Sequence, residues 1–269
     1  MWSLPLGYAL SVILLNLVLY GWRLGRARAA VASGLVERLG LLRAAWSFAA
    51  ECTALAAVVL LVPIGWLLPR CRFGSGARGA LVLLPGSGVN RGALWMLRRR
   101  LRHDGWSPVC CLESPCLRAD VARAARDLRS LVDDLCSHGG RSVTLVGHGL
   151  GGLVARYYVR RYHAPNVRRI VTLGTPHHGT DVARLLRPMV GVLAPGSLFL
   201  RRLNAADHVP EQFDVIAIHS TFDATILPPE NGMYPRAFNV QLNDVGHFAL
   251  LYSRKVYHLM AENLVAPPR

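Results

Sequence analysis

Apolar residues are arranged in two different ways along this chain. The N-terminal part contains two long apolar runs, Leu4–Trp22 and Cys52–Leu68, whereas from Gly79 onward short apolar runs alternate with longer amphipathic stretches. Alternation of that kind is typical of βαβ units around a parallel sheet. The pattern therefore predicts membrane-anchoring helices in residues 1–72 and an α/β domain in residues 73–269.

The second part predicts six strands joined by crossover helices, in a mostly parallel and doubly wound sheet. We expect the strands at 80–84, 108–112, 142–146, 169–173, 213–219 and 238–241, and helices at 91–103, 119–137, 150–163 and 248–264. An apolar, helical insertion at about 181–209 interrupts the alternation and contains Pro188 and Pro195. It could form a lid over a pocket or an ordinary crossover helix packed on the sheet.

The first apolar run has the length of a membrane span. Only Ser11 and Asn16 are polar within it, and about 20 apolar residues cross the hydrocarbon core of a bilayer. An export signal normally begins with basic residues, and no Lys or Arg precedes this run. The sequence therefore favours a retained anchor over a cleaved signal peptide.

The second run is shorter and is weakened by Pro63. It carries no charge between Glu51 and Arg70, and Trp46 and Trp66 stand where interfacial aromatic residues belong. We expect it to form the second arm of a membrane helical hairpin. The alternative is a buried or interfacial arm.

The charge between the runs predicts the orientation of the hairpin. Five arginines lie there against Glu37 alone: Arg23, Arg26, Arg28, Arg38 and Arg43. The positive-inside rule places this connector in the cytoplasm. The α/β domain would then be periplasmic, held at the inner membrane of a bacterium, although Arg70, Arg72 and Arg78 oppose that orientation.

Composition and charge exclude some classes of binding partner. The 269 residues are 52% hydrophobic and carry a formal net charge of +15, which excludes a disordered chain. All the basic residues except Lys255 are arginine, and no basic run is interleaved with aromatic residues as a nucleic-acid groove requires. We therefore expect no nucleic-acid partner, and anionic lipid headgroups suit the charge better.

The cysteines and histidines do not have the spacing of a metal site. Five cysteines follow Arg70, namely Cys71, Cys110, Cys111, Cys116 and Cys136. An oxidising compartment permits a disulfide among them and their odd number leaves at least one thiol free, but we expect buried, inert thiols. His177 and His178 lack a third ligand at zinc spacing. The sequence therefore predicts neither a metal nor a cofactor.

Candidate chemistry begins where the strand at 142–146 runs into Gly147-His148-Gly149-Leu150-Gly151-Gly152. A strand, this glycine-rich turn and a helix are the context of the G-x-S-x-G nucleophile elbow, whose sharp turn requires small residues. Gly149 stands where the serine would present its hydroxyl. Ester chemistry through an acyl-enzyme would therefore lack its attacking atom, and we expect His148 to be a packed residue of the turn.

Two further residues follow in the order that the elbow predicts. Asp223 comes after the strand at 213–219, and His247 after the strand at 238–241. The carboxylate would orient the imidazole, which would take and return a proton. Asp214 and Asp244 are weaker candidates for the acid. The backbone N–H groups of Ser87 and Leu150 are the expected oxyanion donors.

Three stretches carry a resemblance to a known family: Val143–Gly152, Val171–Thr180 and Gly246–Ser253. Over about residues 79–264 the chain resembles the small bacterial triacylglycerol lipases and esterases of the α/β-hydrolase fold. The resemblance, which does not include the apolar runs, implies a lipase or carboxylesterase acting on acyl esters, with Gly149 at the position of the nucleophile, Asp223 as acid and His247 as base. Together with the apolar runs it indicates a membrane-anchored enzyme of this kind. It also implies that Ser87 and Leu150 are the oxyanion donors, although the first strand ends in Pro85-Gly86 instead of His-Gly.

The missing hydroxyl leaves three hypotheses. The chain is an ester hydrolase with impaired chemistry, or a pseudo-hydrolase that binds a lipid or a protein, or it hydrolyses esters through a water held beside Gly149 and activated by His247. The ordered acid and base favour hydrolase ancestry. The protein partners of a binding module are not indicated by any motif.

Overall fold

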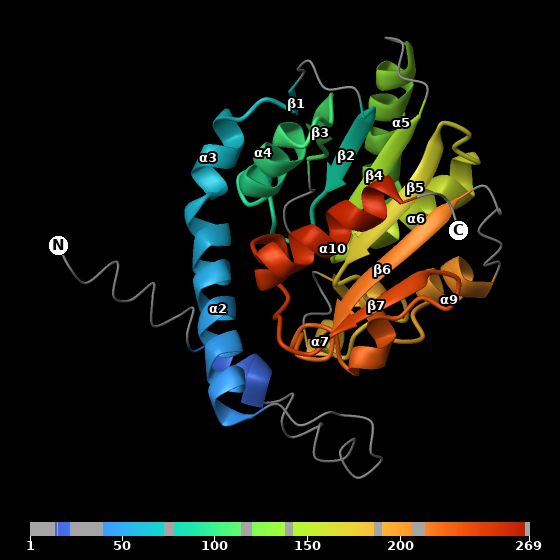
Figure 1. Cartoon of the computed structure of the whole chain (residues 1–269). Coiled ribbons are helices and arrows are strands. Elements are labelled where there is room, and N and C mark those ends of the chain that lie inside the picture. The colour runs from blue at the N-terminus through green and yellow to red at the C-terminus, as the bar shows by residue number, and fades with distance from the viewer. Residues whose placement is uncertain are drawn as a thin grey trace.

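The computed structural model describes residues 14, 16–21, 40–72, 78–113, 120–137, 142–185, 190–205 and 213–266. In these residues a seven-stranded sheet has the order β1-β3-β2-β4-β5-β6-β7. Its neighbouring strands are parallel, except that β1 runs antiparallel to β3 at one edge. The sheet forms the centre of the molecule, and helices cover both of its faces (Figure 1).

All six predicted strands are present, within a few residues of their expected bounds. The strands are β1 (Cys71–Arg72), β2 (Ala80–Leu84), β3 (Val109–Cys111), β4 (Val143–His148), β5 (Val167–Leu173), β6 (Asp214–Ser220) and β7 (Phe238–Leu242). The additional strand, β1, is only two residues long and has no apolar alternation from which it could be predicted. Strand β2 is buried along its whole length, as expected of a central strand in a parallel sheet.

The helices on the two faces follow the amphipathic stretches of the sequence. They are α4 (Trp95–His103), α5 (Val121–Ser137), α6 (Leu150–Tyr162) and α10 (Arg254–Val265), with short helical segments η2 (Pro229–Gly232) and η3 (Ala249–Leu251) in loops. The expected helix at 248–264 is divided because the side chain of Ser253 caps α10 by accepting from the N–H of Val256.

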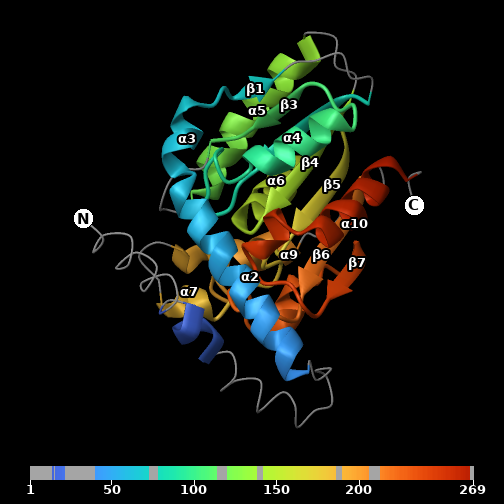
Figure 2. The same ribbon diagram turned by 60° about the vertical axis from the view of Figure 1, so that its left-hand side comes forward.

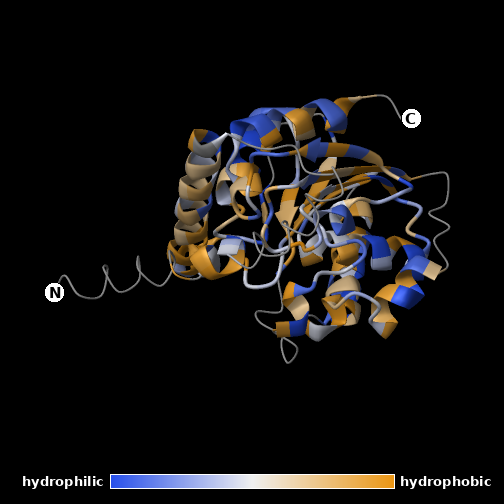
Figure 3. Ribbon diagram, turned by 90° about the horizontal axis from the view of Figure 1, so that it is seen from below, coloured by the Kyte–Doolittle hydropathy of each residue, from blue (hydrophilic) through white to orange (hydrophobic). Residues whose placement is uncertain are grey.

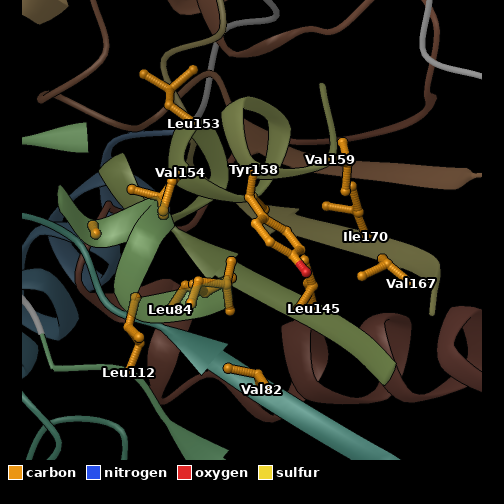
Figure 4. Close-up of a cluster of buried hydrophobic side chains, with 14 of the residues drawn as sticks. Val82, Leu84, Leu112, Leu145, Leu153, Val154, Tyr158, Val159, Val167 and Ile170 are labelled. Atoms are coloured by element: carbon orange, nitrogen blue, oxygen red, sulfur yellow. The ribbon is translucent and has the colours of Figure 1, made fainter. Parts of the chain in front are cut away.

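Alternate side chains of each strand enter two separate cores. Val82 and Leu84 of β2 pack among residues of α5 and α6 (Figure 4). Leu81 and Leu83 point to the opposite face and pack with α4 and α10. Burying each leucine of this kind stabilises the fold by roughly 1.5–3 kcal/mol, so the period-two pattern of the strands fixes which helices lie on which face.

The expected membrane hairpin is not what the N-terminal part forms. Among the described residues one helix is long and apolar enough to cross a membrane, Leu42–Leu60. It belongs to α2 (Leu41–Leu60), which is followed at once by the short α3 (Val62–Leu67). Most of the run 4–22 lies outside the described residues.

The predicted second membrane arm, residues 52–68, is therefore wrong both in its bounds and in its surroundings. The helix begins before Glu51 instead of after it, and it ends at Leu60. Ala54 and Val58 are buried in the same core as Leu81 and Leu83. Figure 2 shows α2 lying along the outside of the domain. Since one face of α2 is occupied by protein, only the other face is free to meet lipid.

The insertion at 181–209 packs against the sheet domain in its described parts. It contains α7 (Val182–Leu185), η1 (Gly191–Leu193) and α9 (Leu198–Ala205). Leu193, Leu200 and Leu203 are buried in the core that also contains α5 and α6.

The cysteine prediction is wrong for one pair. Cys71 and Cys110 form a disulfide, and they lie directly opposite each other in the antiparallel pairing of β1 with β3. The sequence could not reveal the pair because β1 itself was not predicted. Cys111 remains a buried thiol, and burial raises its pKa to about 11. Cys116 lies outside the described residues.

Candidate active site

A single glycine makes the turn between β4 and α6. Strand β4 ends at His148 and α6 begins at Leu150, so Gly149 alone reverses the chain, with φ 52° and ψ −120°. That φ lies in the left-handed region, where a side chain is strained. The N–H of Gly149 donates to the carbonyl of Leu173 at 2.9 Å, which ties the turn to the end of β5.

The glycines on either side of this turn are required by close packing. A Cβ atom on Gly147 would lie 2.5 Å from the nitrogen of Gly152, and a Cβ atom on Gly151 would overlap the carbonyl oxygen of Leu84. The sharp strand-to-helix turn predicted from the glycine pattern is therefore present, and it projects residue 149 from the carboxyl end of the sheet.

Asp223 and His247 are joined beside this turn. The two residues follow β6 and β7, and His247 Nδ1 lies 2.7 Å from Asp223 Oδ2. Asp223 is completely buried, and its other oxygen accepts hydrogen bonds of 2.7 Å from both the backbone N–H and the hydroxyl of Thr225. The carboxylate is thus held in one orientation, with an oxygen available to the imidazole.

The second nitrogen of the imidazole faces residue 149. A Cβ atom on Gly149 would lie 3.3 Å from His247 Nε2 and 3.5 Å from its Cε1. An oxygen attached to that carbon would be within hydrogen-bonding reach of Nε2. The structure therefore brings together the three residues Gly149, Asp223 and His247, which are separated by up to 98 positions in the sequence.

The two ionisable groups of the pair stabilise each other's charge. Burial alone would raise the pKa of Asp223, but the charge and hydrogen bond of His247, with the bonds from Thr225, lower it. Burial alone would lower the pKa of His247, but the charge and hydrogen bond of Asp223, helped by the charge of Glu51, raise it. The imidazole is consequently a better proton acceptor than an isolated histidine.

His148 packs in the turn, as predicted. Its Nε2 donates to the backbone carbonyl of His247 at 3.0 Å, and its ring lies 4.5 Å from the ring of His247, centroid to centroid. Burial, together with the charge of His247, lowers the pKa of His148 to about 3. His148 is therefore neutral near pH 7 and supports the loop that carries His247.

The rival aspartates are occupied elsewhere. Asp214 forms a 2.7 Å ion pair with Arg169 at the start of β6, the end of the strand opposite to Asp223. Asp244 pairs with Lys255 at 2.9 Å. Neither carboxylate is bonded to His247, so the geometry selects Asp223.

The loop after β2 approaches the turn from the other side. The Cα atom of Gly86 would lie 3.7 Å from a Cβ atom on Gly149, so the next residue, Ser87, is beside the turn. The hydroxyl of Ser87 is buried and has no hydrogen-bond partner among the described residues. Leu150 is the first residue of α6, and its N–H therefore has no carbonyl partner within that helix.

The histidines after β5 belong to a separate, buried polar network. His177 bonds Arg156 at 3.2 Å and Thr172 at 3.1 Å, and its ring stacks on Tyr234. Burial lowers the pKa of His177 well below its usual value. In the part of the chain that the structure describes, no three His, Cys, Asp or Glu residues are grouped as metal ligands.

One residue of the site could not be found from the sequence. Glu51 of α2 is only 2% exposed, and its two oxygens accept the N–H groups of Phe248 and Ala249 at 3.0 and 2.9 Å. In the sequence it marks only the edge of an apolar run. A glutamate bordered by apolar residues gave no signal that it reaches a loop almost 200 positions away.

The chain has the α/β-hydrolase fold. Among solved structures it resembles mature Bacillus licheniformis lipase BlEst2 with a TM-score of 0.61 and 17% identity, covering 70% of this chain and 92% of that one. It resembles Aspergillus fumigatus lipase B with a TM-score of 0.60 and 18% identity, covering 74% and 56%. For the Paleococcus ferrophilus monoacylglycerol lipase the TM-score is 0.55 at 18% identity, covering 72% and 97%.

A family model and a curated relative match parts of the chain in sequence. Residues 121–185 match the family described as PGAP1-like alpha/beta domain. A stretch of 62 residues is 40% identical to the GPI inositol-deacylase of Candida albicans, which is 23% of this chain and 16% of that protein. The chain thus spans less than a fifth of the curated relative that it matches. The family match at 121–185 includes the turn at Gly149.

Proposed function

We propose that this protein is a membrane-associated α/β-hydrolase of the lipase or carboxylesterase kind that holds acyl esters but has lost turnover, because Gly149 occupies the position of the nucleophilic serine. One observation carries the proposal. The Nε2 atom of His247, backed by Asp223 at 2.7 Å, faces the position of a side chain at residue 149 from 3.3 Å. A proton relay in this arrangement has its acid and its base, and lacks only the oxygen that it would deprotonate.

The remaining groups fit the steps of ester cleavage. With a hydroxyl at residue 149, His247 Nε2 would take its proton as the oxygen attacks the acyl carbon, and Asp223 would stabilise the resulting imidazolium. The N–H groups of Ser87 and Leu150 would stabilise the tetrahedral oxyanion. His247 would then give the proton to the leaving alcohol. Without that hydroxyl no acyl-enzyme forms, so the site as it stands can bind an ester but not take its acyl group.

The compared proteins support an ester as the ligand class. The solved relatives are named lipases, and the curated relative is named a deacylase. The Gly149→Ser substitution tests the proposal: hydrolysis of short p-nitrophenyl esters should appear in a chain that otherwise lacks it. A folded Gly149→Ser protein that cleaves no ester would reject the proposal.

A lipid-binding pseudo-hydrolase is the second candidate function: the site would bind esters as its function and would not cleave them. Gly149 favours this candidate because it removes the attacking oxygen. A binding role predicts that the unmodified chain binds a fluorescent acyl ester saturably, and that an unlabelled ester displaces it better than the matching free alcohol does. Fluorescence polarisation measures both. Absence of saturable binding would remove the lipid-binding role and would also contradict the proposal that the site still holds acyl esters.

The outer face of α2 and α3 is the proposed membrane contact. This face exposes large apolar side chains, namely Leu42, Trp46, Val59, Leu60, Ile64, Trp66 and Leu67, and Figure 3 shows α2 as a mainly apolar column at the side of the domain. A helix with one face on protein and the other free lies in the membrane interface instead of crossing the bilayer. The net charge of +15 favours an anionic lipid surface.

The domain is proposed to lie in the periplasm of a bacterium, at the inner membrane. The Cys71–Cys110 disulfide supports this location, because disulfides persist in oxidising compartments.

Tryptophan quenching tests the membrane contact. In vesicles that contain brominated lipids, replacing Trp46 and Trp66 by phenylalanine should remove about a third or more of the quenching, because interfacial tryptophans lie at headgroup depth and these are two of six. Replacing the buried Trp106 is the matched control and should leave the quenching unchanged. Equal losses in the two proteins would contradict the assignment.

A further inference from the structure

The helix that the sequence presents as a membrane element carries an ionisable carboxyl group into the protein interior. Glu51 lies near the middle of α2, and only 2% of its surface is exposed. Burying a carboxylate is costly unless hydrogen bonds replace the lost water. Its burial here therefore has to be explained by the partners that it meets.

Those partners flank His247 on its C-terminal side. Glu51 Oε1 accepts the N–H of Phe248 at 3.0 Å, and Oε2 accepts the N–H of Ala249 at 2.9 Å. Phe248 directly follows His247 in the chain. Both oxygens of the carboxylate are thus used to hold the backbone that carries the imidazole.

The residue on the N-terminal side of His247 is also fitted to Glu51. A Cβ atom on Gly246 would overlap Glu51 Oε2 and would lie 2.5 Å from its Cδ. The three nearest atoms to such a Cβ all belong to Glu51. The backbone before and after His247 therefore packs against one side chain of α2.

The surroundings of Glu51 change the pKa of its carboxyl group. Burial raises the pKa of Glu51 to about 7, against the lowering effect of the two N–H groups and of His247, and Asp223 adds to the raising effect. His148, the other ionisable group of the cluster, is neutral near pH 7. Folding thus favours the protonated form of Glu51. The free energy of unfolding therefore falls as the pH rises from 4.5 to about 7, where the folded protein must release this proton.

A second N-terminal contact reaches the loop of the acid. The ring of Tyr20 lies 4.9 Å from the ring of Phe222 and 5.3 Å from that of Phe48 in α2. Phe222 directly precedes Asp223, and Tyr20, Phe222 and Ala224 form one buried cluster. The N-terminal part of the chain therefore contacts the loops of both Asp223 and His247.

We propose that Glu51 is a positioning residue for His247, so that docking of α2 on the domain and alignment of the proton relay are one structural event. This inference rests on the proposed function only for the role of His247 as the base. The contacts that carry it are independent of turnover. Helix α2 then serves both as a lipid-facing element and as a brace of the active site.

A double-mutant cycle on the unmodified chain tests the contact. Gly246→Ala should lower the Tm sharply when Glu51 is present, because the new methyl group overlaps the carboxylate. It should lower the Tm far less in the Glu51→Ala background, where the overlapping atoms are gone. Additive effects of the two substitutions would overturn the proposed packing.

Titration of the His247 ring by NMR tests the positioning role separately. In Glu51→Gln, which keeps the shape but removes the charge and one of the two backbone acceptors, the midpoint of the His247 titration should fall by about half a pH unit or more. Thr53→Ala, an exposed change on the same helix, is the control and should not move it. A folded Glu51→Gln protein with an unchanged His247 titration would overturn the role, and this readout needs no catalysis.

Enzyme kinetics provide a third test if Gly149→Ser hydrolyses esters. In that background, Glu51→Gln should lower kcat more than it changes KM and should move the acidic limb of the pH profile to lower pH. A loss of activity with an unmoved pH profile would indicate a general loss of stability and contradict the positioning role. If Gly149→Ser is inactive, the NMR result still decides the question, so the two proposals fail separately.

Discussion

The Gly149→Ser variant is expected to hydrolyse short p-nitrophenyl esters with a kcat/KM at least about 10³-fold above that of the unmodified chain. Loss of a nucleophile from a complete triad typically costs roughly 10⁴–10⁶ in rate, and binding and the oxyanion hole supply the remainder. The gain is expected because every other group is in place: a Cβ atom at residue 149 lies 3.3 Å from His247 Nε2, and the imidazole is bonded to Asp223. The measurement is the initial rate of nitrophenol release.

Two controls separate the hydroxyl from the side chain that bears it. Gly149→Ala introduces the same Cβ at φ 52° without an oxygen, so it should show the strain of the turn and none of the activity. Adding His247→Ala to Gly149→Ser should remove most of the gained rate. If Gly149→Ala gains as much activity as Gly149→Ser, the hydroxyl is not the missing group.

The largest effect on stability is expected from Arg169→Met. Arg169 in β5 is buried and pairs with Asp214 at 2.7 Å. Its guanidinium also donates to the carbonyl oxygens of Asn263, Leu264 and Ala266 at the end of α10. Removing it leaves the carboxylate of Asp214, whose side chain is 11% exposed, without its counter-ion and three carbonyls without a donor. Loss of one partner of such a pair costs about 3–5 kcal/mol.

A thermal melt followed by circular dichroism measures this loss. For a domain of this size we expect the Tm of Arg169→Met to fall by roughly 10 °C. Arg168→Met is the matched control, because Arg168 is the preceding residue of the same strand and is exposed. It should change the Tm by only a degree or two. Equal effects of the two substitutions would show that the buried network does not stabilise the fold.

Much of the fold could be predicted because the buried strands and amphipathic helices carry their own periodicity. The six strands of the central sheet were found because each is a short apolar run bounded by turn residues. The turn at Gly149 was found because close packing there admits only glycine at neighbouring positions. These features are encoded locally, within a few residues of each other.

What could not be predicted depends on contacts between distant segments. The Cys71–Cys110 pair requires the antiparallel pairing of β1, a strand too short to show a pattern. The docking of α2 depends on Glu51 meeting the backbone after His247. An apolar helix that packs on a domain and one that crosses a bilayer have similar hydropathy, so the sequence alone indicated the wrong environment for its inner face.

The composition of the candidate site was predictable while its geometry was not. Asp223 and His247 were identified by their positions after strands in the order that the fold expects. Their bond, and the approach of His247 to residue 149, come from the carboxyl ends of β4, β6 and β7 lying at one edge of the sheet. The exclusion of Asp214 and Asp244 likewise required their partners, Arg169 and Lys255, to be seen.

Covalent labelling with a fluorophosphonate tests the central claim most directly, because such a probe reacts only with a hydroxyl that a neighbouring base activates. The Gly149→Ser protein should take up one probe molecule, located by peptide mass spectrometry at residue 149, and the unmodified chain should take up none. Adding His247→Ala should abolish the labelling. A folded Gly149→Ser protein that stays unlabelled, or one labelled at Ser87 instead, would contradict the account of a proton relay that lacks only its oxygen.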